Sequence, residues 1–70
     1  MKTKTLIELI EFMEMYEKEI EKIILDYDGS KSKFDSLEEL EEEAFKYGFE
    51  SESIVIHEIN KKTKVLTIYM

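Results

Sequence analysis

The sequence predicts a small α+β domain in which two helices precede two strands. Apolar residues recur at steps of three and four through the first 47 residues, which is the spacing of helices that bury one face. After Gly48 the chain becomes rich in β-branched residues, and a polar turn divides this part in two. We therefore expect one domain, residues 1–70, with two helices packed on a C-terminal antiparallel β-hairpin.

The first predicted helix covers residues 5–27. Thr5 and Glu8 have the spacing of a capping box, in which each side chain binds a free backbone N–H of the first turn. Glu17 lies within the apolar sector of this helix, and the sequence leaves its role open. The apolar stripe consists of Leu6, Leu9, Ile10, Met13, Tyr16, Ile20, Ile23, Ile24 and Tyr27.

A turn over residues 28–35 separates this helix from a second one over residues 37–47. Asp28-Gly29 favours a turn, and a glycine suits the left-handed position after a helix end. Ser36 and Glu39 repeat the capping-box spacing, and Gly48 is a natural helix end. The apolar stripe of the second helix is Leu37, Leu40, Ala44 and Tyr47.

Residues 53–59 and 64–70 are predicted strands joined by a turn at residues 60–63. An odd-length connection would place Ile59 opposite Val65. This register gathers one apolar face, and burial of one such face fixes the register of a hairpin. The gathered face holds Ile54, Ile56, Leu66, Ile68 and Met70, together with Glu58.

The second face of this hairpin is too apolar to remain in water. Two strands alone are marginally stable, so pairing of hairpins across a two-fold axis would complete a four-stranded sheet. We therefore expect a homodimer, or a hairpin edge that extends the sheet of a partner. The predicted dimer face holds Val55, His57, Ile59, Val65, Thr67 and Tyr69.

The composition excludes several classes of functional site. The chain has no cysteine, one histidine and two glycines, which excludes disulfide scaffolds, thiolate or His-rich metal sites and glycine-rich phosphate loops. No nucleophile stands beside an evident base, so we expect no catalytic residue, no enzyme activity, no metal and no cofactor. His57 is predicted to be a half-buried cross-strand residue, with its role left open.

The sequence also lacks the marks of membrane insertion and export. No apolar run approaches the roughly 18–20 residues that span a bilayer. The apolar stretch near the N-terminus is interrupted by Glu8 and Glu11, unlike a secretory signal. We expect a soluble cytoplasmic protein, located in the host cytoplasm if it is viral.

Part of the chain resembles the helix-turn-helix family of transcription regulators. That family has a small residue, a glycine four positions later and an aliphatic residue six positions after the glycine, which Ala44, Gly48 and Ile54 match. Glu43 and His57 depart from the pattern, because apolar residues are expected there. The resemblance covers about 20 residues, including Leu40, Tyr47 and Phe49, and implies a recognition helix over residues 51–60.

The net charge of −7 is unevenly distributed. Residues 1–52 carry −9 and residues 53–70 carry +2. Phosphate repels such an acidic surface, whereas basic surfaces that normally hold nucleic acid attract it. The predicted partner-binding face consists of Glu8, Glu11, Glu19, Glu38, Glu39, Glu41, Glu42 and Glu43.

Small size, high negative charge and the lack of catalytic residues are similar to phage- and virus-encoded DNA mimics and anti-CRISPR proteins. We therefore expect a non-enzymatic inhibitor that occupies a basic nucleic-acid-binding surface of a host defence protein, without binding nucleic acid or membrane itself. Two alternatives stay open. One is a homodimeric structural or regulatory module that uses the hairpin face, and the other is the helix-turn-helix regulator.

Overall fold

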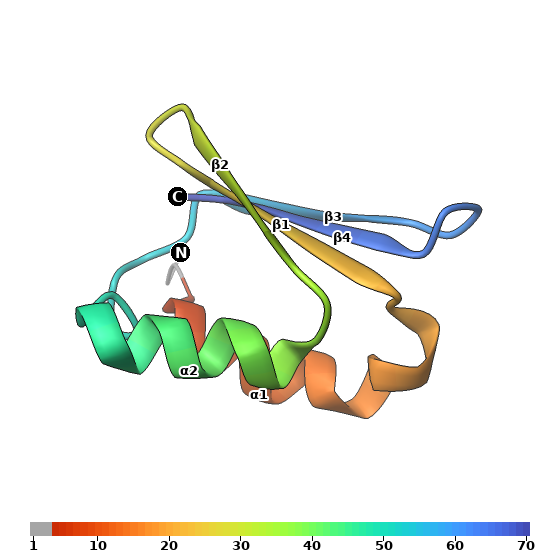
Figure 1. The fold of residues 1–70 in the computed structure, drawn as a ribbon, viewed down its shortest axis with the longest axis horizontal. Helices are drawn as coiled ribbons and strands as arrows, with labels where there is room; N and C mark the ends of the chain where they lie inside the picture. Colours follow the sequence, from red (N-terminus) through yellow and green to blue (C-terminus); the bar gives the residue numbers. More distant parts are fainter. Residues whose placement is uncertain (1–3) are drawn as a thin grey trace.

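The computed structural model describes residues 4–70 and confirms an α+β fold, with two helices and a four-stranded mixed sheet (Figure 1). A short 3₁₀ helix, η1 (Glu14–Glu19), follows the first α-helix. The elements are α1 (Leu6–Met13), β1 (Lys22–Tyr27), β2 (Ser30–Phe34), α2 (Leu37–Tyr47), β3 (Ile56–Asn60) and β4 (Val65–Tyr69).

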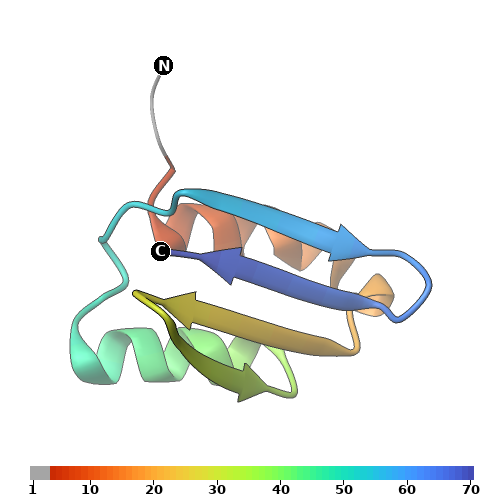
Figure 2. The same cartoon turned by 90° about the horizontal axis from the view of Figure 1, so that it is seen from above.

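The strand order is β2-β1-β4-β3, so β1 and β4 are central. These two strands run parallel, whereas β1–β2 and β4–β3 are antiparallel hairpins. Both helices cover the same face of the sheet, α1 beside the β3–β4 hairpin and α2 beside the β1–β2 hairpin (Figures 1 and 2). The other face of the sheet is uncovered by any helix of the described chain.

The core lies between the helices and the covered sheet face. The central strands supply Ile23, Leu25, Leu66 and Ile68 from alternate positions, as a sheet with one buried face requires. The buried hydrophobic residues are Leu6, Leu9, Ile10, Met13, Ile23, Leu25, Phe34, Leu37, Leu40, Ala44, Ile54, Leu66 and Ile68. No charged or polar residue of the described chain is fully buried.

The prediction of one helix over residues 5–27 is wrong beyond Met13. The backbone leaves helical geometry at Tyr16, where φ is −116° and ψ is 18°, and the chain then enters β1. In a strand, Ile23 and Leu25 point to one face, and both are buried there. The apolar residues of this segment have a spacing that also suits a helix. Their burial in a strand between β2 and β4 overrides that local preference. Glu17 lies on η1 and is exposed, so its place in an apolar sector disappears with the helix.

The predicted turn over residues 28–35 is also wrong, because most of it forms β2. Asp28 and Gly29 have φ values of 50° and 89°, and Tyr27 pairs with Ser30. Two central residues with positive φ define the type I′ turn, which matches the twist of a two-residue hairpin. Asp-Gly is therefore the signal for a β1–β2 hairpin and not for a helix end.

The helix over residues 37–47 is confirmed, with Gly48 in the left-handed conformation at φ 76°. The Ser36 hydroxyl accepts from the Glu39 N–H at 3.2 Å, as its capping position predicts. The Glu39 carboxylate does not close the predicted box, because Oε2 accepts from the Asp35 N–H at 2.7 Å instead.

The predicted register of the C-terminal hairpin is wrong by one residue. Ile59 pairs with Leu66, and Asn60 pairs with Val65, which leaves a connection of four residues. The Asn60 side chain accepts from the N–H groups of Lys62 and Thr63, and its carbonyl accepts from Lys64 N–H at 2.7 Å. Lys64 adopts a φ of 58°. These local bonds set an even connection, so the two predicted side-chain sets are mixed.

The N-terminus of α1 is tied to the segment before β3. The Thr5–Glu8 capping box is confirmed. The N–H groups of Leu6 and Ile7 donate to the carbonyls of Glu52 and Glu50, both at 2.9 Å. Because the first N–H groups of a helix have no partner inside it, these bonds fix α1 beside the C-terminal hairpin.

The recognition helix implied by the helix-turn-helix resemblance is absent from the structure. Residues 56–60 form β3, and Ser53 forms a bridge with Thr5. A strand at this position pairs with β4 and presents no helix that could enter a DNA groove.

Candidate interaction surfaces

Charge is segregated between the two layers of the fold. Segments 6–19 and 35–47, which form the helical layer, hold eleven acidic residues and two lysines. The four strands and the 61–64 connection hold six lysines and two acidic residues. The protein therefore has an acidic helical side and a mildly basic sheet side, which a net charge of −7 conceals.

The structure divides the predicted acidic face into separate groups. Glu8 and Glu39 are engaged by backbone N–H groups at the starts of the two helices. Glu19 lies on η1, away from α2, and lines a groove beside β3. Glu11 is exposed on α1. The remaining residues, Glu38, Glu41, Glu42 and Glu43, all belong to α2.

An exposed phenylalanine lies among the carboxylates of α2. Glu38, Glu41, Glu42, Phe45 and Lys46 line a shallow hollow of about 540 Å³, and the Phe45 side chain is 55% exposed. Phe45 is not part of the predicted partner-binding face. It follows buried Ala44 directly in α2, and its side chain therefore points away from the core. We call this set, without Lys46, the α2 acidic patch.

The predicted dimer face is divided between the two sides of the sheet. Val65, Thr67 and Tyr69 alternate with buried Leu66 and Ile68, so they lie on the uncovered face. His57 and Ile59 pair with Ile68 and Leu66 and therefore lie on the helix side. Val55 precedes β3 and is 75% exposed. The even connection is the physical reason that these six residues do not form one face.

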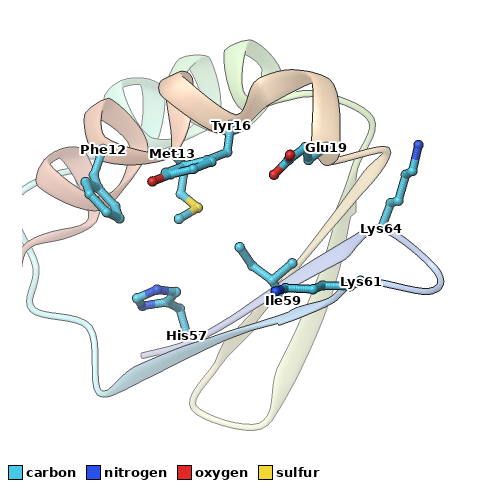
Figure 3. Close-up of a pocket in the computed structure, with 8 residues that line it drawn as sticks. All are labelled: Phe12, Met13, Tyr16, Glu19, His57, Ile59, Lys61 and Lys64. Carbon is cyan, nitrogen blue, oxygen red and sulfur yellow. The ribbon is translucent and has the colours of Figure 1, made fainter.

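A groove of about 680 Å³ lies between the α1–η1 segment and β3. Figure 3 shows Phe12, Met13 and Tyr16 on the helical side, opposite His57 and Ile59 on β3. The hairpin connection supplies cationic side chains at one end. We call this the β3 groove, and it is lined by Phe12, Met13, Tyr16, Glu19, His57, Ile59, Lys61 and Lys64.

The two aromatic side chains of the β3 groove contact each other, and one of them also contacts Lys4 outside the groove. The Phe12 and Tyr16 rings pack edge to face, with centroids 5.8 Å apart and planes at 62°. The Lys4 Nζ lies 4.1 Å from the Phe12 ring centroid, within the range of a cation–π interaction. At the other end, Lys64 Nζ lies 4.0 Å from Glu21 Oε1. The groove is thus apolar at its centre, and its charged lining residues are Glu19, Lys61 and Lys64, of which Lys64 is paired with Glu21.

A separate polar contact joins the end of β1 to the segment before β3. The Tyr27 hydroxyl donates a hydrogen bond to the Glu52 carboxylate, and the Tyr27 ring packs edge to face on Phe49 with centroids 6.0 Å apart. The hydrogen bond with Glu52, followed by desolvation and the charges of Glu52 and Asp28, raises the pKa of Tyr27 above 10.0. The hydrogen bond stabilises the neutral form of the Tyr27 phenol, and it links the end of β1 to the segment before β3.

Among residues 4–70, no group of three or more His, Cys, Asp or Glu side chains is arranged to hold a metal ion. No helix in the same part of the chain is both long and apolar enough to cross a membrane. The chain matches no protein-family description, no curated protein and no solved structure.

Proposed function

We propose that the protein is a non-enzymatic interaction module whose α2 acidic patch occupies a basic, nucleic-acid-binding surface of another protein. The observation that carries this proposal is Phe45, 55% exposed between Glu38, Glu41 and Glu42. A face that only kept the protein in solution would need the carboxylates and not the exposed ring.

The energetics favour a protein partner over free cations. Burying the exposed half of a phenylalanine, about 100 Å², contributes roughly 2–3 kcal/mol. Carboxylates around such an anchor give orientation and fast association, while the ring gives affinity. Within residues 4–70, Glu38, Glu41 and Glu42 form no ion pair, so their charges are available to a partner.

The host setting is part of the same proposal. A phage or viral protein that inhibits a defence nuclease in the manner of a DNA mimic would need a compact acidic surface and no catalytic group. The separation of charge between the helical and sheet layers supports this reading, because it concentrates the negative charge of the chain on one side.

A photo-crosslinking amino acid at position 45 tests the proposal, with the same group at position 69 on the uncovered sheet face as control. The captured protein is purified, and its binding to nucleic acid is measured with increasing amounts of the wild-type protein. We expect capture from position 45 alone and displacement of the nucleic acid. Equal capture from position 69, or a captured protein whose nucleic acid stays bound, would contradict the proposal.

The homodimeric alternative rests on a smaller observation. Val55, directly before β3, and Ile56, its first residue, are 75% and 52% exposed. The sequence predicts a dimer because a sheet of two strands is marginally stable. In the structure, β1 and β2 complete a four-stranded sheet within one chain, so this reason for a dimer no longer applies. Light scattering at high micromolar concentration tests it, because a mass that stays near 8.4 kDa would exclude the dimer.

A further inference from the structure

We propose that the β3 groove binds an extended, acidic peptide segment of a partner protein, which pairs with β3 as a fifth strand. The inference concerns a different surface from the α2 acidic patch and stands independently of it. Its two parts are a sheet edge that pairs with no further strand of residues 4–70 and so offers backbone hydrogen bonds, and an adjacent groove that takes side chains.

Directly before β3, the outer side of the chain forms backbone contacts with residues 4 and 5. The Ile54 N–H donates to the Lys4 carbonyl at 2.9 Å, and the next N–H, that of Val55, donates to the Tyr69 carbonyl of β4 at 2.8 Å. Successive N–H groups thus point to opposite sides, and the antiparallel Thr5–Ser53 bridge lies on the side away from β4. β3 continues this line, and within residues 4–70 it pairs with β4 alone.

The two edges of the sheet differ in their protection. β2 carries Lys31 and Lys33, the kind of side chain that discourages pairing at an edge. β3 has no lysine and no proline between its ends, and Ile56 and Ile59 remain 52% and 37% exposed. Its one acidic residue is Glu58. Within residues 4–70 the β3 edge, beside the groove, is therefore the less protected of the two edges.

The groove itself selects the chemistry of the added strand. Its centre, between the Phe12 and Tyr16 rings and Ile59, suits an aromatic or aliphatic side chain. Glu19 also lines the groove and Lys64 is paired with Glu21, so Lys61, which forms no ion pair within the described residues, is the lining side chain that can bind a carboxylate. An apolar residue followed by acidic ones fits both features.

A second copy of the chain fits less well. Two β3 strands that pair antiparallel about Glu58 would set two carboxylates directly opposite each other, which is destabilising. The carboxylate at the centre of β3 therefore favours a different protein as the source of the strand.

The test uses the acetylated peptide Thr-Phe-Thr-Leu-Asp-Asp, titrated into the ¹⁵N-labelled protein. We expect amide shifts in β3 and at Phe12 and Tyr16, with slowed hydrogen exchange along β3. A peptide with N-methyl groups on alternate amides keeps its side chains but loses strand pairing, so it should bind at least about tenfold more weakly. Equal binding of the methylated peptide would assign the groove to a small apolar ligand and overturn the proposal.

Matched variants locate the site. Ile59→Lys, which faces the groove, should weaken binding about tenfold or more, whereas Ile56→Lys on the opposite face of β3 should not. Lys61→Glu should weaken binding more than Lys62→Glu, since Lys62 lies in the same connection but outside the groove. Equal effects within either pair, no shifts at millimolar peptide, or concentration-dependent shifts of β3 without peptide would each overturn the proposal. If Ile59→Lys fails to fold, Tyr16→Ala replaces it.

Discussion

Two neighbouring isoleucines test whether residues 22–27 form a central strand. Ile23 is fully buried and lies between Phe34 of β2 and Leu66 of β4, whereas Ile24 points to the uncovered sheet face and is partly exposed. In one continuous helix both would belong to the apolar stripe. Ile→Val removes one methylene group and keeps the β-branched shape, so strand propensity changes little.

The expected cost for Ile23→Val is about 0.5–1.5 kcal/mol, because the deleted group leaves a cavity in a closely packed core. A domain of this size has a total stability of about 4–10 kcal/mol, so the variant still folds. With a urea dependence of about 1 kcal/mol per molar, its unfolding midpoint should fall by about 0.5–1.5 M. Ile24→Val should lie within about 0.5 kcal/mol of the wild type. Equal losses for the two variants would refute the strand assignment.

Three other predictions follow from local geometry. Gly29→Ala should destabilise the protein by about 1 kcal/mol, because φ is 89° at this position. A Cβ there would meet no neighbour, so the cost arises from the backbone conformation alone. Asp28→Asn should be nearly neutral, and equal losses of stability in urea unfolding would contradict the type I′ turn. Thr5→Ala should cost about 1 kcal/mol through loss of the cap, and no change in the unfolding midpoint would contradict this. Absorbance at 295 nm should show a tyrosine that titrates above pH 10.0, and Glu52→Gln should lower that pKa. Because the folded-state pKa of Tyr27 is raised, its contribution to stability is present below pH 10 and is lost as the pH rises through the folded value.

Local signals in the sequence were sufficient for some elements. Thr5 caps the first helix, Ser36 caps the second and Gly48 ends it, as predicted, because each of these features depends on residues a few positions away. The β-branched run after Ile54 likewise forms strands. Because these features depend on residues only a few positions apart, they can be predicted from a single sequence.

The errors occurred where distant residues decide the structure. Ile23 and Leu25 satisfy both a helical and an alternating spacing, and only the parallel partner β4, some forty residues later, selects the strand. The Asp28-Gly29 dipeptide is a signal for a hairpin turn. Once residues 5–27 are taken as a helix, however, the same dipeptide is interpreted as the end of that helix. Among the site residues, Phe12 and His57 lie on opposite sides of the β3 groove, and this placement depends on a sheet topology that local signals do not carry.

The most direct test of the proposed function is the salt dependence of binding to the captured partner, measured for charge variants. Glu38→Lys with Glu42→Lys changes the α2 acidic patch at two exposed positions, and Glu21→Lys with Glu58→Lys makes the same change in net charge outside α2. We predict that affinity for the partner falls with rising salt, and that the α2 pair abolishes this dependence while the second pair preserves it. Binding of the wild type that is indifferent to salt, or equal losses for the two pairs, would contradict the α2 acidic patch as the binding surface.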